Sequence, residues 1–174
     1  MNLPARRLQV TLFIPEPLAS DLDVVRQRWD PVMAHRIRPH ITVLRRVDDV
    51  EATRAALHAS EGWGPCRLRL GSIQRAPVAH GSGVFIDVVD SHGDLRRIRS
   101  RLATALAADN EAVQTHPHVT LTHPRTVARA QNADAWQHLR QQRLDREFVV
   151  DRLSLIAETD DGWSCIDSRP LADS

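Results

Sequence analysis

The sequence predicts an α+β fold in which two pseudo-symmetric lobes of antiparallel sheet, with outer helices, face each other across a central groove. Three observations predict this: a repeated order of strands and helices, a pair of matching histidine motifs, and a length of 174 residues that suits one compact domain. The domain spans residues 1–174, and its lobe-like repeats cover about residues 8–76 and 82–170.

The first repeat begins with strand, helix and short strand. Residues 8–14 are rich in strand formers and stop at two prolines. Apolar residues then recur at helical spacing from Leu18 to Trp29, and Pro31 should interrupt or end that helix. A short β-branched strand, residues 40–44, follows a proline.

A helix and a strand close the first repeat. Asp48 or Asp49 can cap a helix that runs through about Ser60. Apolar residues alternate with arginines over residues 66–70, which predicts a half-buried strand. Residues 76–82, with their proline and glycines, form a plausible junction to the second repeat.

The second repeat has the same order of elements. Helical spacing of apolar residues and β-branched runs predict these elements, and an Asp-Asp-Gly sequence predicts a hairpin turn. They are a strand at 84–88, a helix from about Asp94 to Asn110, a short strand at 118–121, a helix at 132–144, a long strand at 148–156, a turn at 160–162 and a strand at 163–166.

Composition limits the class of protein. The 23 basic and 22 acidic residues leave a formal charge of only +1, which excludes the broad positive field of bulk nucleic-acid binders. Every basic residue is arginine, which fits either phosphate recognition or, more simply, a coding bias. The separated cysteines Cys66 and Cys165 indicate neither a zinc site nor a disulfide. Without a signal peptide or a membrane-length apolar run, we expect a cytoplasmic monomer that needs neither a membrane nor an obligatory protein partner.

Two tetrapeptides of the form His-apolar-Thr-apolar occupy matching places in the two repeats. They are His40-Ile41-Thr42-Val43 and His118-Val119-Thr120-Leu121. Side chains alternate between the faces of a strand, so each histidine shares a face with its threonine while the apolar residues enter the core. If a pseudo-twofold axis relates the strands, two imidazoles and two hydroxyls surround one phosphate-sized space.

This set of groups suits phosphodiester chemistry. One histidine can take a proton from the attacking oxygen while the other gives one to the leaving oxygen, and threonine hydroxyls can hold the non-bridging oxygens. No metal or other cofactor is required. A lone histidine on a strand is more often a core residue, but two on matched strands would each need a buried polar partner. A metal site at His116, His118 and His123 is disfavoured because prolines break the ligand spacing.

At these residues the chain resembles the two-histidine phosphoesterase superfamily, and specifically the 2′-5′ RNA ligase-like and cyclic phosphodiesterase proteins. The resemblance covers nearly the whole chain, including Arg38-Pro39 before the first motif. It implies a metal-independent phosphodiesterase acting on 2′,3′-cyclic phosphate ends of RNA or nucleotides. A reversible 2′-5′ RNA ligase and a non-catalytic RNA-end or nucleotide-binding module stay open as alternatives.

The resemblance also implies roles for individual residues. His40 and His118 would be the acid and base, and Thr42 and Thr120 the donors to phosphate oxygens. The family often places a basic or aromatic residue beside the groove. The basic candidates are Arg38, Arg45 and Arg125, and the aromatic candidates are Phe13, Phe85, Phe148 or a tryptophan, although each aromatic residue is more often part of a core.

Overall fold

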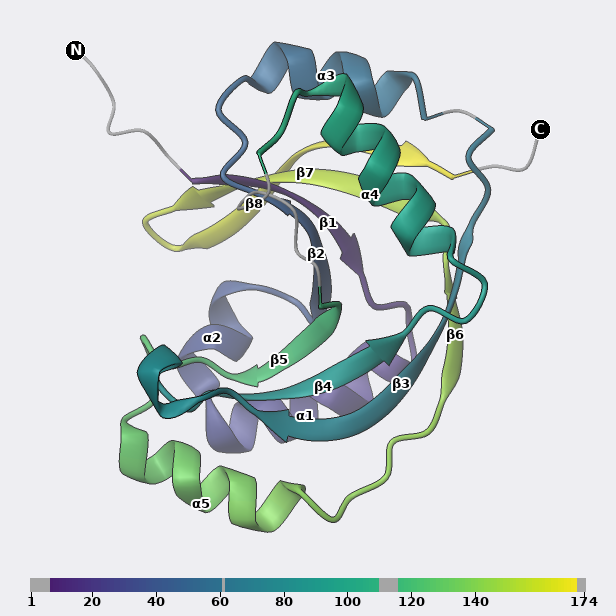
Figure 1. Cartoon of the computed structure of the whole chain (residues 1–174). Coiled ribbons are helices and arrows are strands. Elements are labelled where there is room, and N and C mark those ends of the chain that lie inside the picture. The colour runs from purple at the N-terminus through teal and green to yellow at the C-terminus, as the bar shows by residue number, and fades with distance from the viewer. Residues whose placement is uncertain (1–6, 61, 110–115, 172–174) are drawn as a thin grey trace.

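The chain folds into one curled antiparallel sheet, a half-barrel with helices on its outside (Figure 1). The computed structural model describes residues 7–60, 62–109 and 116–171. The strands are β1 (Leu8–Phe13), β2 (His40–Arg45), β3 (Cys66–Arg75), β4 (Val84–Val89), β5 (His118–Thr122), β6 (Glu147–Val150), β7 (Arg152–Thr159) and β8 (Gly162–Pro170). Their order in the sheet is β6-β3-β4-β5-β2-β1-β7-β8, with every neighbouring pair antiparallel. The predicted α+β class is confirmed.

The helices cover the two sides of the curled sheet. They are α1 (Leu18–Trp29), α2 (Pro31–Arg36), α3 (Val50–His58), α4 (Asp94–Ala105) and α5 (Arg129–Leu139). Figure 1 shows α3 and α4 on one side and α1, α2 and α5 on the other. Over the part of the chain that is described, no helix is long and apolar enough to cross a membrane.

The two repeats exchange their closing strands. β3, the last strand of the first repeat, pairs with β4 of the second, and β7 pairs with β1. The helices follow the same exchange, because α1 packs on β5 and α4 packs on β2. Each half of the sheet is therefore built from both repeats, and the contiguous segments 8–76 and 82–170 do not form separate halves in space.

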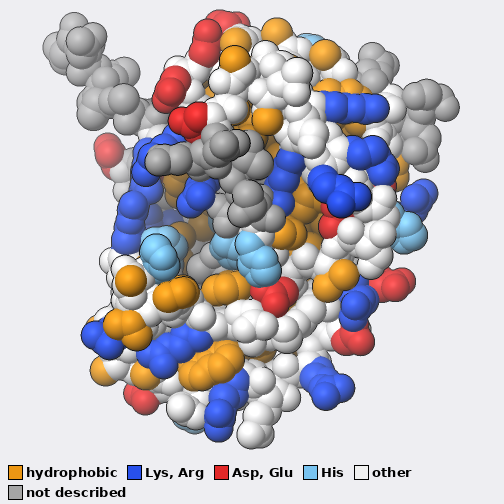
Figure 2. Space-filling model, in the orientation of Figure 1, with side chains coloured by type: hydrophobic (Ala, Val, Ile, Leu, Met, Phe, Trp, Pro, Cys, Tyr) orange, Lys and Arg blue, Asp and Glu red, His pale blue; other side chains and the backbone are white. Residues whose placement is uncertain are grey.

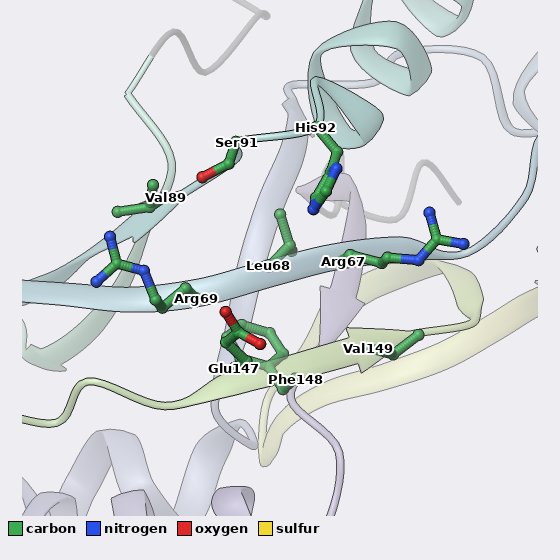
Figure 3. Close-up of a pocket in the computed structure, with 9 residues that line it drawn as sticks. All are labelled: Arg67, Leu68, Arg69, Val89, Ser91, His92, Glu147, Phe148 and Val149. Atoms are coloured by element: carbon green, nitrogen blue, oxygen red, sulfur yellow. The ribbon is translucent and has the colours of Figure 1, made fainter.

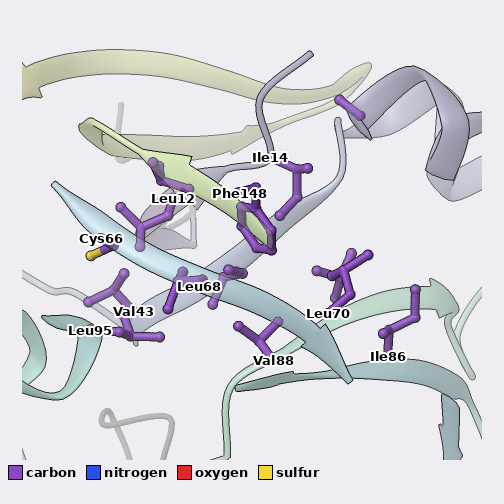
Figure 4. Close-up of a cluster of buried hydrophobic side chains, with 14 of the residues drawn as sticks. Leu12, Ile14, Val43, Cys66, Leu68, Leu70, Ile86, Val88, Leu95 and Phe148 are labelled. Carbon is purple, nitrogen blue, oxygen red and sulfur yellow. The ribbon is translucent and has the colours of Figure 1, made fainter. Parts of the chain in front are cut away.

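One apolar core runs through both halves. Alternate residues of β3 enter it, and Figure 4 shows Cys66, Leu68 and Leu70 gathered with Ile86 of β4 and Phe148 of β6. Burial of alternate side chains is the pattern expected for a sheet with one face against helices. The opposite face of the central strands is left for polar residues.

The predicted long strand over residues 148–156 is wrong. It is divided at Asp151 into β6, which pairs with β3, and β7, which pairs with β1 and β8. These partners lie near opposite ends of the strand order, so the chain crosses from one end to the other through a single residue. A continuous apolar run records burial but not which neighbour each part pairs with.

The prediction at Pro31 is confirmed, and two further boundaries differ from the prediction. Pro31 does end α1, but it also begins α2, where Asp30 accepts a hydrogen bond from the Met33 amide at 3.0 Å. The helix expected to end near Asn110 ends at Ala105, and Asn110 lies outside the described residues. The helix expected at 132–144 is α5, which begins and ends earlier.

Two local predictions are confirmed. Asp49 caps α3 by accepting a hydrogen bond from the Ala52 amide at 2.9 Å. The turn at residues 160–162 joins β7 to β8, and its last residue must be glycine. A Cβ on Gly162 would lie 2.5 Å from the carbonyl oxygen of Arg36, so no other residue fits without movement.

We expect Ile41→Ala to lower the free energy of unfolding by about 2–5 kcal/mol, because Ile41 is fully buried and the change leaves a cavity behind β2. Urea unfolding followed by circular dichroism measures the loss. Val24→Ala, on an exposed position of α1, should change stability by no more than about 0.5 kcal/mol. Equal losses for the two variants would contradict the described core.

Candidate active site

The motif residues alternate between the two faces of β2 and β5. The histidines and threonines are partly exposed, whereas the residues that follow them are buried. The partly exposed residues are His40, Thr42, His118 and Thr120, and the buried residues are Ile41, Val43, Val119 and Leu121. The alternation predicted from the sequence is therefore present in both strands.

The pairing of β2 with β5 places the two motifs next to each other. Ile41 lies opposite Val119 in this antiparallel pair. A regular ladder continued from this pair would bring Thr42 opposite His118 and His40 opposite Thr120. Residues directly opposite have Cβ atoms about 4.5–5.5 Å apart, and diagonal neighbours such as the two histidines about 7–8 Å. Two imidazole rings at this separation can contact one phosphate group from different sides.

Both histidines have the same ring nitrogen fixed by the backbone. Nδ1 of His40 lies 2.9 Å from the carbonyl oxygen of Arg38, and Nδ1 of His118 lies 2.9 Å from that of His116. A carbonyl oxygen only accepts hydrogen bonds, so Nδ1 carries the hydrogen in each ring. The neutral form of each histidine then has its lone pair on Nε2.

Burial and nearby arginines favour the neutral imidazoles. Burial, aided by the charges of Arg26 and His118 and opposed by the hydrogen bond to the Arg38 carbonyl, lowers the pKa of His40 to about 4. Burial also lowers the pKa of His118, and the charges of His116, Arg45 and Arg99 act in the same direction. In the free protein near neutral pH, both rings are therefore uncharged.

Two buried arginines lie behind the site on equivalent helices. Arg26 of α1 donates to the carbonyl oxygen of Ile37 at 2.7 Å, and Arg99 of α4 donates to that of Thr42 at 2.9 Å. Both are almost fully buried. Their charges lower the pKa of His40 and His118 respectively and favour an anion at the site.

Two of the three candidate phenylalanines lie beside the histidines. The ring centre of Phe13 is 6.4 Å from that of His40, and the ring centre of Phe85 is 4.9 Å from that of His118. Both rings are partly exposed, whereas Phe148 belongs to the core. The expectation that aromatic residues are more often core residues holds for Phe148 alone among these three.

The three candidate arginines lie in different surroundings. The guanidinium of Arg38 lies 5.5 Å from the ring centre of Phe13. Arg45 ends β2, and its charge lowers the pKa of His118. Arg125 follows β5, and its charge lowers the pKa of His123. Figure 2 shows histidine side chains along a hollow in this face of the molecule, with arginines around it.

Sequence reasoning missed Asp87 and the role of His116. Asp87 lies opposite His118 in β4, and its carboxylate is 2.8 Å from Nε2 of His116. A charged residue within the apolar strand 84–88 was the available signal, but nothing local indicated its partner. Arg26 and Arg99 were missed because an arginine on a helix is ordinarily solvated.

The histidines weighed as metal ligands have other contacts. His116 bonds to Asp87, and Nδ1 of His123 accepts a hydrogen bond from the Arg125 amide at 3.1 Å. Across residues 7–60, 62–109 and 116–171, no group of three or more His, Cys, Asp or Glu is arranged to hold a metal ion.

Two cavities lie away from the motif histidines. The first cavity, of about 280 Å³, lies around β3, β6 and the segment after β4. Its lining, shown in Figure 3, includes Arg67, Arg69 and His92. β4 separates β3 from β5, so this cavity is distinct from the site. A second cavity of about 650 Å³ lies beyond the end of β2 and includes Arg45 in its lining.

Comparison with known proteins gives one family and a set of similar folds. A model described as the 2′-5′ RNA ligase superfamily matches residues 14–162. None of the curated proteins matches the chain. Among solved structures, TT0787 of Thermus thermophilus is 16% identical with a TM-score of 0.68, over 97% of this chain and 99% of that one.

Two further structures have the same fold at low identity. E. coli LigT complexed with 3′-AMP is 15% identical with a TM-score of 0.62, over 97% of this chain and 99% of that one. Usb1 of Kluyveromyces marxianus is 13% identical with a TM-score of 0.57, over 96% of this chain and 99% of that one.

We expect wild-type stability to fall more steeply than that of His40→Gln as the pH is lowered from about 6.5 to about 4. The unfolded chain protonates His40 near pH 6.5, but the folded protein protonates it only near 4. Within that window the unfolded state binds more protons, so stability is lost as pH falls. Urea unfolding at several pH values measures this, with the exposed His35→Gln as control. Parallel curves for wild type and His40→Gln would show the assignment to be wrong.

Proposed function

Because the chain belongs to the 2′-5′ RNA ligase superfamily, we propose that it is a metal-independent phosphodiesterase that opens 2′,3′-cyclic phosphates on RNA ends or nucleotides. The observation that carries the proposal is the pairing of β2 with β5 at Ile41 and Val119, together with the backbone carbonyl that holds Nδ1 of both His40 and His118. Members of this family are enzymes that break or form phosphoester bonds.

The reaction is an in-line displacement at phosphorus. A neutral imidazole accepts a proton from water through Nε2 as the water oxygen bonds to phosphorus. The second imidazole, protonated, gives its Nε2 proton to the ribose oxygen as the bond from phosphorus to that oxygen breaks. One ring ends protonated and the other neutral, so a proton returns between turnovers, and the product is a phosphomonoester.

The threonines and the substrate's own charge complete the site. Thr42 and Thr120 each share the partly exposed face of their strand with a motif histidine, and from this face their hydroxyls can donate hydrogen bonds to the non-bridging oxygens. The negative phosphate favours the protonated form of an adjacent imidazole, which opposes the effect of burial. Binding of the negatively charged substrate thus favours protonation of one of the two imidazole rings.

Neighbouring groups suit the nucleoside part of the substrate. The partly exposed rings of Phe13 and Phe85 flank the two histidines and offer surfaces for a base. Arg38 and Arg45 add positive charge near the site. E. coli LigT, whose fold is similar, has been crystallised with 3′-AMP, phosphate, NADP+ and ATP. These complexes support the proposal that this protein also binds a nucleotide.

We expect His40→Ala and His118→Ala each to lower kcat by roughly 100-fold or more, the usual contribution of a general acid or base. The substrate is an oligoribonucleotide ending in a 2′,3′-cyclic phosphate, and the assay contains a chelator. His35→Ala, on an exposed position of α2, should keep the wild-type rate. A motif variant with full activity would exclude that histidine.

The products of the same assay distinguish the remaining functions. Release of a phosphomonoester supports the phosphodiesterase, and joining of two RNA pieces through a 2′-5′ bond indicates a ligase. Tight binding of a 2′-phosphorylated nucleotide without turnover of any cyclic substrate would indicate that the protein is a binding module and not an enzyme.

We expect bell-shaped pH profiles, because one histidine must be neutral while the other is protonated. The pKa of His40 is about 4 and burial lowers that of His118, so kcat/KM should be maximal below pH 6.5. A bound phosphate raises the pKa of both His40 and His118, so the maximum of kcat should lie at a higher pH than the maximum of kcat/KM. Steady-state rates across pH test this, and a flat profile or a kcat/KM maximum above 6.5 would contradict it.

A further inference from the structure

The residue two positions before each motif histidine bonds to that histidine through its backbone carbonyl, and in the second half the rings of His116 and His118 also stack, with their centres 6.5 Å apart. The carbonyl oxygens of Arg38 and His116 accept the hydrogen bonds that set the tautomers of His40 and His118. Each carbonyl can do this only if its own residue is fixed. The structure shows how both are fixed, and the two halves of the site differ in how close the carboxylate lies to the positioning residue.

In the first half, β1 holds Arg38. Phe13 lies opposite His40 in the sheet, and the guanidinium of Arg38 lies 5.5 Å from the centre of its ring. The next residue, Pro39, accepts a hydrogen bond from the amide of Ile14 at 3.0 Å. A residue before proline is confined to extended conformations, which limits the directions that the Arg38 carbonyl can take.

In the second half, β4 holds His116 in the equivalent way. Asp87 lies opposite His118, and its carboxylate is 2.8 Å from Nε2 of His116. Pro117 accepts a hydrogen bond from the amide of Val88 at 2.9 Å. The backbone contacts of the two halves therefore correspond, and each half has an aromatic ring and a carboxylate beside the positioning residue: Phe13 and Glu16 beside Arg38, and Phe85 and Asp87 beside His116. The carboxylate is closer in the second half, at 2.8 Å from His116 compared with 3.9 Å from Arg38.

We propose that Arg38 and His116 are positioning residues that fix the ring orientation and tautomer of His40 and His118, and that Asp87 acts on His118 through His116. The catalytic meaning of this arrangement rests on the proposed function. The coupling itself is a property of the fold and can be measured without a substrate.

The contact of Arg38 with Phe13 and the contact of His116 with Asp87 differ in strength and in the number of residues that they connect. A guanidinium over a phenylalanine ring is a weak attraction that tolerates sliding. The Asp87 carboxylate is directional, and it also accepts hydrogen bonds from Gln74 at 3.1 Å and Ser72 at 3.3 Å, both on β3. A chain of contacts thus runs from β3 through Asp87 and His116 to His118, and substitutions along it should affect His118 while leaving His40 unchanged.

The test is the tautomer of each histidine, read from the ¹⁵N chemical shifts of the two rings above neutral pH. In the wild type both rings should hold the hydrogen on Nδ1. In Asp87→Ala, His118 should become a mixture of tautomers while His40 stays unchanged. Asp87→Asn retains an oxygen that can accept from His116 and should restore much of the Nδ1–H form. Asp145→Ala removes a carboxylate paired with Arg69 at the other edge of β3 and serves as the control.

His116→Ala provides an independent arm, because it keeps the carbonyl but removes the side chain that anchors it. His116 is exposed, so this variant remains informative if Asp87→Ala does not fold. It should give the same mixture of tautomers at His118. In both variants kcat should fall roughly 10- to 100-fold, as when a group that orients a functional histidine is removed, while KM changes little.

The outcomes separate this proposal from the proposed function. If His118 keeps its hydrogen wholly on Nδ1 in both Asp87→Ala and His116→Ala, the positioning role is wrong. If the tautomers change as expected but the wild-type protein turns over no cyclic phosphate, the coupling stands and the proposed function fails.

Discussion

The antiparallel pairing of β2 with β5 is the constraint on which the site depends. These strands come from segments far apart in the chain, and their register, Ile41 opposite Val119, decides which side chains share a face. A slip of one residue in either strand would turn its histidine and threonine into the core and bring apolar residues out. The register of this pair therefore decides whether the two motif histidines lie on the same polar face of the sheet.

Support for this pairing comes from the opposite face of the sheet. Ile41, Val43, Val119 and Leu121 are almost fully buried there, and α1 and α4 pack across the two central strands. Hydrogen bonds to backbone carbonyls offset part of the cost of placing two partly buried histidines and two buried arginines here. Apolar packing on one face thus holds in place a polar face that would not form by itself.

The parts predictable from the sequence were those set by local periodicity. His-apolar-Thr-apolar motifs gave the shared face of each histidine and threonine, and Asp49 gave the start of α3, because strand alternation and helix capping act over a few residues. Pairing partners act over long distances and were not predictable: residues 148–156 became two strands with different neighbours, and nothing near Asp87 indicated its contact with His116. The same limit explains why the basic candidates Arg38, Arg45 and Arg125 could be named but not placed.

The exchange of closing strands has a consequence for how the chain acquires its structure. Leu8 pairs with Ala157, so β1 makes its hydrogen bonds on that side only when β7, about 150 residues further along the chain, is in place. A fold with such distant pairings has a high contact order, which slows folding and leaves apolar strand faces uncovered in the meantime.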